Sequence, residues 1–263
     1  MNYQYLHFEV EGGVAWITFC RPERANTLNL EFARELHAVA RYCDDHAGIR
    51  AVVIKAEGKI FCAGGDLAFF AAAGDELPAI IEGLLAEFHG AIEIFSSMNA
   101  PLIVAVNGAA AGVGLSIVAA ASLAYATANA KFTMAYTNAG LSPDGSSTYH
   151  LPRLVGWRRC QELMLTNRVL SAAEAKEWGL VNDCYNDAAA LDQAVSELAR
   201  RLAAGPTQAF GQVRRLLIAS GGRSLREQMD LEGRSFAQMT RSQDGSEGIS
   251  AFMEKRRAVF VGR

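Results

Sequence analysis

The longest uncharged segment of the chain predicts its buried centre. Residues 94–130 contain no Asp, Glu, Lys, Arg or His. A membrane-spanning helix needs about 20 consecutive apolar residues, so the length of the segment raises that question. Asn107-Gly108, Gly112 and Gly114 interrupt it, however, and it has neither aromatic belts nor flanking basic clusters. We therefore expect no membrane span, but a buried strand at 101–106, a glycine turn at 107–114 and a small-residue helix at 115–123.

Strands alternate with helices in the pattern of the first 205 residues. Leu6, Phe8 and Val10 alternate with polar neighbours, which predicts a hairpin with 14–19. Short apolar runs predict strands, and apolar residues at helical spacing predict helices. The expected strands are 51–54, 124–127 and 131–136, the helices 30–45, 78–98 and 187–203, and the loops 21–27, 59–66 and 138–145. A capping box, Ser171 to Glu174, followed by Gly179 predicts one further short helix.

The last part of the chain shows helical patterns alone. Gly205-Pro206 marks the expected boundary, and three helices are predicted beyond it, separated at 221–222 and at 244–246. Strands alternating with helices, followed by helices alone, predict the α/β class. We expect a core over 1–205 and a helical region over 206–263.

Composition limits the classes of partner. The residues are 51% hydrophobic and 20% charged, which predicts a packed core. A net charge of −3 gives no reason to expect nucleic acid. The five cysteines are an odd set without CxxC spacing, which favours a reducing compartment over a disulfide framework or a zinc site. The first residues lack the pattern of a signal peptide, and we expect a cytoplasmic location.

The sequence does not complete a dinucleotide-binding turn, a nucleophile elbow or a histidine metal site. Gly112-Val-Gly114 resembles a dinucleotide-binding turn, but its third glycine would fall at Ile117 and no acid follows about twenty residues later. Gly114-Leu-Ser116 lacks the last glycine of a nucleophile elbow. No two histidines have metal-ligand spacing, so we expect no metal.

Two glycine loops and two proton carriers remain as candidate chemistry. Backbone N–H groups from the loops around Gly65 and Val113 could converge on one oxygen, as an oxyanion hole requires. Asp144 and His89 are the candidate proton carriers. Each feature also has a plain structural interpretation, because paired glycines and an aspartate after proline are common in turns, and His89 lies on an apolar helical stripe where it could pack in the core.

Together these stretches resemble the crotonase (enoyl-CoA hydratase/isomerase) superfamily. The matching segments are 21–26, 61–67, 101–114, 140–145, 151–156 and 174–181. The resemblance implies a spiral of ββα units with a C-terminal α-helical trimerisation region, assembled as a homotrimer or hexamer. It implies an acyl-CoA thioester substrate, with CoA as part of the substrate and no other cofactor.

The resemblance also implies roles for particular residues. The amides of Gly65 and Val113 would form the oxyanion hole, although the family usually has glycine at the second position. The CoA path would be lined by Arg24, Ala25, Ala63, Asp66 and Leu67. Phe260 with Lys255 or Arg256 would close over the adenine and 3′-phosphate, often from a neighbouring subunit. The basic residues could equally form a solvated helix face.

The departures from the family pattern bear most on the reaction. Hydratases of the family use two glutamates, and Ser116 and Tyr136 stand at those positions. Asp144 occupies a position where several isomerases have an aspartate, which favours a double-bond shift with Asp144 as proton shuttle. The second alternative is an atypical enoyl-CoA hydratase. The resemblance also admits the 4-chlorobenzoyl-CoA dehalogenases, or a related hydrolytic enzyme. In that class an aspartate at the position of Asp144 attacks the ring, and a histidine at the position of His89 activates the water that hydrolyses the resulting ester. Phe88 and Tyr136 stand here at the positions of the aromatic residues that hold the ring. A non-catalytic CoA-ester-binding oligomer is the fourth alternative.

Overall fold

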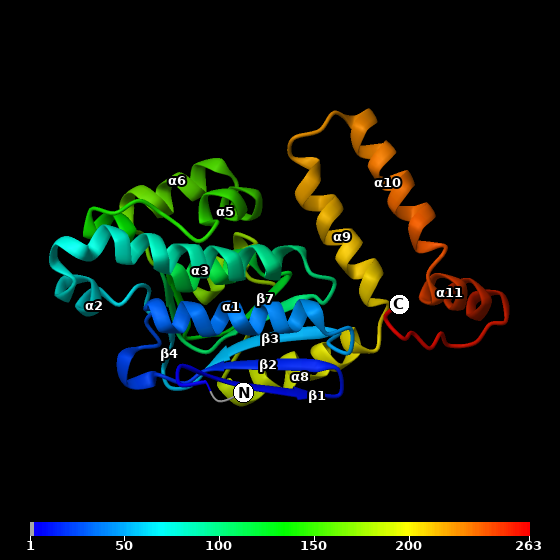
Figure 1. The fold of residues 1–263 in the computed structure, drawn as a ribbon, viewed down its shortest axis with the longest axis horizontal. Helices are drawn as coiled ribbons and strands as arrows, with labels where there is room; N and C mark the ends of the chain where they lie inside the picture. Colours follow the sequence, from blue (N-terminus) through cyan, green and yellow to red (C-terminus); the bar gives the residue numbers. More distant parts are fainter. Residues whose placement is uncertain (1–2) are drawn as a thin grey trace.

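A computed structural model describes residues 3–263, and two mainly parallel sheets form its core (Figure 1). The larger sheet has the order β1-β2-β3-β5-β7-β10, and only β1 is antiparallel to its neighbour. Its strands are β1 (Leu6–Glu11), β2 (Val14–Phe19), β3 (Ala51–Ala56), β5 (Leu102–Val106), β7 (Leu123–Thr127) and β10 (Asp183–Tyr185). The smaller sheet, in the order β4-β6-β8-β9, consists of β4 (Ile60–Cys62), β6 (Ala109–Ala111), β8 (Lys131–Thr133) and β9 (Leu170–Ser171).

Successive strand pairs divide between the two sheets. β3, β5 and β7 enter the larger sheet, and the strands that follow them, β4, β6 and β8, lie parallel in the smaller one. Helices complete the turns of this ββα spiral, which confirms the α/β class and the spiral that the family resemblance implied. The smaller sheet was not predicted: β4 lies in the expected loop at 59–66 and β6 in the expected turn at 107–114. Three-residue strands are too short to show an alternating pattern.

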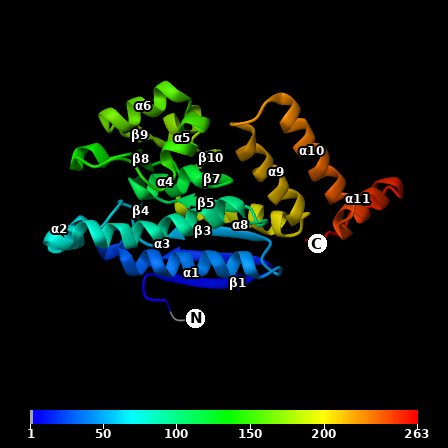
Figure 2. The ribbon, with the colours of Figure 1, turned by 45° about the horizontal axis from the view of Figure 1, so that its top comes forward.

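The uncharged character of the central strands follows from burial on both sides of the larger sheet. Val52, Ile54 and Val104 face the main core under α1 (Leu30–Asp45) and α3 (Leu77–Ser97). Val53 and Ile103, one residue out of phase, face α8 (Ala188–Ala203) on the other side. Figure 2 shows α1 and α3 side by side over the sheet. A strand buried on both faces reads as a continuous apolar run. Within residues 3–263, no helix is both long and apolar enough to cross a bilayer.

Short helices surround the junction of the two sheets. They are η1 (Pro22–Arg24), α2 (Leu67–Ala72), η2 (Gly74–Glu76), α4 (Val113–Ala120), η3 (Tyr136–Ala139), α5 (Ser147–Val155), α6 (Trp157–Thr166) and α7 (Ala172–Glu177). The capping box of Ser171 and Glu174 is confirmed at α7. The strand expected over 131–136 ends early, because Ala135 has a φ of 57° and redirects the chain into η3.

Three helices project to one side of the core, as the sequence predicted (Figure 1). They are α9 (Thr207–Ser220), α10 (Leu225–Met239) and α11 (Gln243–Met253). The break predicted at 244–246 was wrong, since it lies before Ser242, which caps α11 by accepting the N–H of Gly245. Asp244 is buried in the first turn of α11, and its carboxylate accepts the N–H groups of Val261 and Gly262. The proposed division at 205/206 falls between α8 and α9 and stays a prediction.

Candidate active site

The two glycine loops meet backbone to backbone at the junction of the sheets. Gly64, with φ of 110°, follows β4, and Gly112, with φ of 51°, precedes α4. A Cβ placed on Gly112 would lie 3.4 Å from the Cα of Gly64. Both positions require glycine for conformation, and the lack of side chains allows the two turns to touch.

The main-chain amides of the next residues, Gly65 and Val113, donate no hydrogen bond within residues 3–263. In the parallel bridge between Leu28 and Gly65, the N–H of Leu28 donates to Gly64 and its carbonyl accepts from Asp66. The N–H of Gly65 therefore faces away from Leu28. Val113 is the first residue of α4, where an amide has no intrahelical acceptor. Within the described part of the chain, neither the Gly65 nor the Val113 amide donates a hydrogen bond.

Both amides border one cavity of about 260 Å³, which also receives Asp144. Asp144 is the only carboxylate among the residues that line this cavity, and most of the others are apolar. The lining residues include Leu28, Ala63, Leu67, Phe70, Leu77, Ile81, Leu84, Leu85, Met134, Tyr136, Leu141 and Ser142. Unpaired N–H groups in an apolar cavity favour a ligand oxygen that carries or develops negative charge.

Only one of the two Asp144 carboxylate oxygens accepts a hydrogen bond from the described residues. Tyr136 Oη donates to Asp144 Oδ1, and no hydrogen bond within residues 3–263 reaches Oδ2. Burial raises the pKa of Asp144 above its usual value, while the Tyr136 hydrogen bond and nearby His89 partly oppose that rise. Burial and the Asp144 charge raise the pKa of Tyr136 as well, so the phenol keeps its proton. The carboxyl group is thus suited to accept and return a proton.

Ser116 joins the same polar network from the opposite side. Its side chain is fully buried on α4, and its Oγ lies 3.3 Å from Tyr136 Oη and 3.1 Å from the main-chain oxygen of Asp144. The two positions that depart from the family pattern, Ser116 and Tyr136, therefore contact each other and Asp144.

His89 and Phe88 lie behind the Asp144 turn rather than in the cavity. His89 is exposed on α3, and its Nε2 accepts the N–H of Gly145 over 3.2 Å. The interpretation of His89 as a buried core residue was wrong, because its side chain is exposed. The hydrogen bond to the backbone that this interpretation included is present. Phe88 is fully buried, and its ring lies against Gly145, where a Cβ would come within 2.6 Å of it.

The residues expected along the CoA path divide into two groups. Ala63 and Leu67 line the cavity, and Leu67 is exposed at its edge. Arg24, Ala25 and Asp66 do not line it. Arg24 is the exposed last residue of η1, and Ala25 follows it as a partly buried cap, held beside the cavity because the Ala63 N–H donates to the Ala25 carbonyl. The Asp66 carboxylate caps α2 by accepting the Phe69 N–H, and its Oδ2 lies 3.9 Å from Nη2 of Arg21. Its contacts therefore stabilise the local loop and the start of α2.

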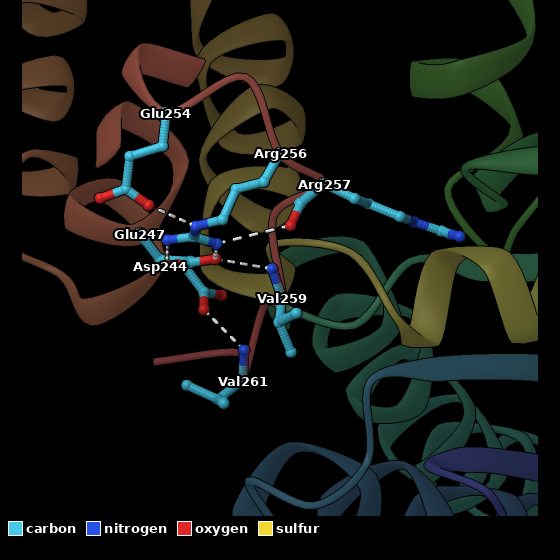
Figure 3. Close-up of polar contacts among 7 residues, drawn as sticks. All are labelled: Asp244, Glu247, Glu254, Arg256, Arg257, Val259 and Val261. Carbon is cyan, nitrogen blue, oxygen red and sulfur yellow. Dashed lines mark hydrogen bonds and ion pairs between the residues drawn. The ribbon is translucent and has the colours of Figure 1, made fainter. Parts of the chain in front are cut away.

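Lys255, Arg256 and Phe260 belong to the segment after α11, which lies on the other side of the core from α2 (Figure 1), and none of the three lines the cavity. The Arg256 guanidinium is held by Glu247 and Glu254, each at 2.6 Å (Figure 3). The Phe260 carbonyl accepts from Arg50. Within one chain these residues do not reach the cavity. Their role from a neighbouring subunit stays a prediction.

Sequence reasoning missed part of the cavity wall. Ile81, Leu84 and Leu85 line it from the first half of α3. Their spacing continues the apolar stripe of Leu84 and Phe88 toward the start of the helix, and this was the signal that could have revealed them. Met134, Leu141 and Ser142 lie in irregular segments and gave no comparable signal.

On this ββα spiral, one cavity is lined by two residues whose main-chain amides have no acceptor within residues 3–263 and by one partly buried carboxylate, an arrangement suited to chemistry through an oxyanion. The model of the enoyl-CoA hydratase/isomerase family matches residues 9–263, and the chain belongs to this family. It is 34% identical to 1,2-epoxyphenylacetyl-CoA isomerase of Escherichia coli, with 99% of each chain aligned. It is 38% identical to 4-chlorobenzoyl coenzyme A dehalogenase-2 of Arthrobacter sp., over 79% of this chain and 76% of the relative. An enoyl-CoA hydratase from Polaromonas sp. JS666 has a similar structure, with a TM-score of 0.91, 31% identity and coverage of 97% and 99%.

Proposed function

We propose that this enzyme shifts a double bond within an apolar acyl-CoA thioester. The observation that carries the proposal is that Gly65, Val113 and a single partly buried carboxylate, Asp144, line one largely apolar cavity. A double-bond shift needs one base that removes a proton and returns it elsewhere, together with donors for the enolate oxygen. The single carboxylate among the described residues that line the cavity supports this reaction over hydration, for which hydratases of the family use two glutamates.

The steps follow from the chemistry of the thioester. Asp144 Oδ2 takes a proton from the carbon next to the thioester carbonyl, and the C–H electrons pass into that carbonyl to form a dienolate. The amides of Gly65 and Val113 bind the oxyanion. Oδ2 then returns the proton to the far end of the conjugated system, the carbonyl re-forms and the double bond has moved. The balance needs no water and no other reactant.

The cavity lining supports an apolar acyl group. Apart from Ser142, Tyr136 and Asp144, the side chains around it are hydrocarbon or methionine. An alkyl chain or an aromatic ring suits such walls, while a second carboxylate would be desolvated without a cationic partner. We propose that CoA itself lies outside the cavity, past Ala63 and Leu67.

We also propose that the protein assembles as a homotrimer, or as a hexamer built from two trimers. Large apolar side chains project from α10 and α11 with most of their surface exposed: Leu225 76%, Phe236 75%, Phe252 82% and Met253 75%. Contiguous apolar exposure of this kind is typical of subunit interfaces. Such an assembly would also allow a neighbouring Lys255 or Phe260 to approach the CoA of another subunit.

The test follows exchange of substrate protons with deuterated solvent. With an unbranched 3-enoyl-CoA and a phenyl-bearing acyl-CoA, the wild-type protein is expected to exchange protons and move the double bond. Asp144→Asn is expected to lower exchange by at least about a hundredfold, the scale of general base catalysis. Asp192→Asn, which removes an exposed carboxylate paired with Lys55, is the matched control and keeps full exchange.

Three results would contradict the proposal. Exchange that survives in Asp144→Asn would remove Asp144 as the base. An enzyme carboxylate oxygen found in the product after a single turnover in labelled water would support dehalogenase-like attack instead. Binding of the CoA esters without turnover of any of them would support a non-catalytic role.

A further inference from the structure

Tyr136, which is partly buried, and Ser116, which is fully buried, are polar groups that the proposed reaction does not use directly. Tyr136 begins η3, directly after Ala135 with its left-handed φ of 57°. This conformation aims the phenol back over the Gly112 turn, where a Cβ on Gly112 would lie 3.7 Å from the phenol carbon that bears Oη. Ser116 donates to the main-chain oxygen of Asp144 and holds the turn that carries the carboxylate.

The contacts of the carboxylate are asymmetric. Oδ1 receives the Tyr136 hydroxyl, and Oδ2 receives no hydrogen bond from the described residues. A carboxylate with two free oxygens can rotate about its Cβ–Cγ bond and present either one. A charge-assisted hydrogen bond to one oxygen fixes the rotation and leaves the other as the single proton acceptor.

We infer that Tyr136 is a positioning residue, which fixes the Asp144 carboxylate so that Oδ2 alone carries the proton, with Ser116 holding the turn beneath it. The inference rests on the proposed function of Asp144 as the base. The phenol remains a donor in both protonation states of Asp144, first to a carboxylate and then to the carbonyl oxygen of the acid. No proton leaves Tyr136 at any step.

Two titratable groups act on the Asp144 carboxylate. Tyr136 on η3 donates a hydrogen bond to it, and His89 on α3 lies behind the turn that carries it; both oppose the rise in the pKa of Asp144 that burial causes. Asp144 must be ionised to act as the base. Removing the Tyr136 hydroxyl therefore raises the pKa of Asp144 and moves the acid limb of the rate profile to higher pH.

The test compares three variants by solvent exchange across pH. Tyr136→Phe is expected to lower the maximal exchange rate by about tenfold, the scale of one hydrogen bond to a charged group, and to move the acid limb to higher pH. Replacement of Tyr136 by 3-fluorotyrosine, a more acidic and stronger donor of nearly equal size, is expected to move the limb to lower pH. Thr137→Val removes the neighbouring hydroxyl of η3, which donates to Met164 instead, and leaves the limb in place.

The outcomes separate this inference from the proposed function. If Asp144→Asn abolishes exchange but neither Tyr136 variant moves the acid limb, the positioning role is overturned and the base remains. If Asp144→Asn leaves exchange intact, both fall. Should Tyr136→Phe be inactive for other reasons, ¹³C NMR titration of labelled Asp144 measures the same shift without turnover, and an unchanged titration overturns the inference.

Discussion

The N–H of Gly145 donates to Nε2 of His89 over 3.2 Å, and this bond links the long helix α3 to the turn that carries Asp144. Because Nε2 is the acceptor, the neutral ring carries its proton on Nδ1. The nitrogen that a water-activating base would use is thus occupied by the backbone.

His89→Gln provides the first prediction. Glutamine offers an amide oxygen to the Gly145 N–H, so we expect the double-bond shift to be retained within a few-fold. His89→Leu leaves that N–H without its acceptor and is expected to lower the free energy of unfolding by about 1 kcal/mol. Steady-state rates and chemical denaturation measure the two effects. Complete loss of turnover in His89→Gln, with normal stability, would show that the imidazole takes part in the chemistry.

Gly65→Ala is expected to damage the site more than the fold. A Cβ at this position would lie 2.7 Å from the edge of the Phe70 ring, which lines the cavity and must move. We expect a fall in kcat/KM of at least about tenfold with a stability loss below about 1 kcal/mol. Combining it with Phe70→Leu, which removes the obstructing ring edge, is expected to recover part of the loss. A double-mutant cycle with no coupling between the two positions would contradict this account.

Gly114→Ala is expected to destabilise the fold. Its Cβ would lie 2.5 Å from the main-chain oxygen of Cys62, so that the β4 backbone must shift. Overpacking of this kind costs about 1–3 kcal/mol. Gly83→Ala is the matched control, since nothing lies within 4 Å of its Cβ on α3, and it is expected to stabilise the helix by about 0.5–1 kcal/mol. Thermal unfolding of both variants measures the difference, and equal melting temperatures would refute it.

The stability of Asp144→Asn should depend on pH with a definite sign. Burial raises the pKa of Asp144 in the folded protein, so folding favours the protonated acid. Its stabilising contribution is complete below the pKa of the unfolded chain and is lost as pH rises through the folded pKa. At neutral pH the charged carboxylate therefore costs stability, and Asp144→Asn is expected to unfold at a higher temperature than the wild type. The advantage should shrink toward acid pH, and a variant less stable at pH 7 would contradict the expectation.

The hydrophobic pattern predicted the long elements well, because α1 repeats its buried stripe over several turns and β5 is an apolar run that is buried throughout. It failed where three residues form a strand, as at β4 and β6. The glycines near 64 and 112 indicated the meeting of two loops, and the family resemblance singled out the two candidate amides, whose role stays a prediction. The contact between Tyr136 and Asp144 was beyond such reasoning, because it depends on left-handed residues at Ala135 and Gly140 that reverse the chain between them.

In the proposed reaction, the roles of Gly65, Val113 and Asp144 have a consequence for how this fold can diversify. Two of the three contributions come from peptide groups, which every amino acid except proline supplies, so ordinary point mutation cannot delete them directly. The third is one replaceable side chain on a separate segment. New reactions on the same thioester can therefore arise by exchanging the acid and its neighbours, while the inherited anion receptor persists without redesign.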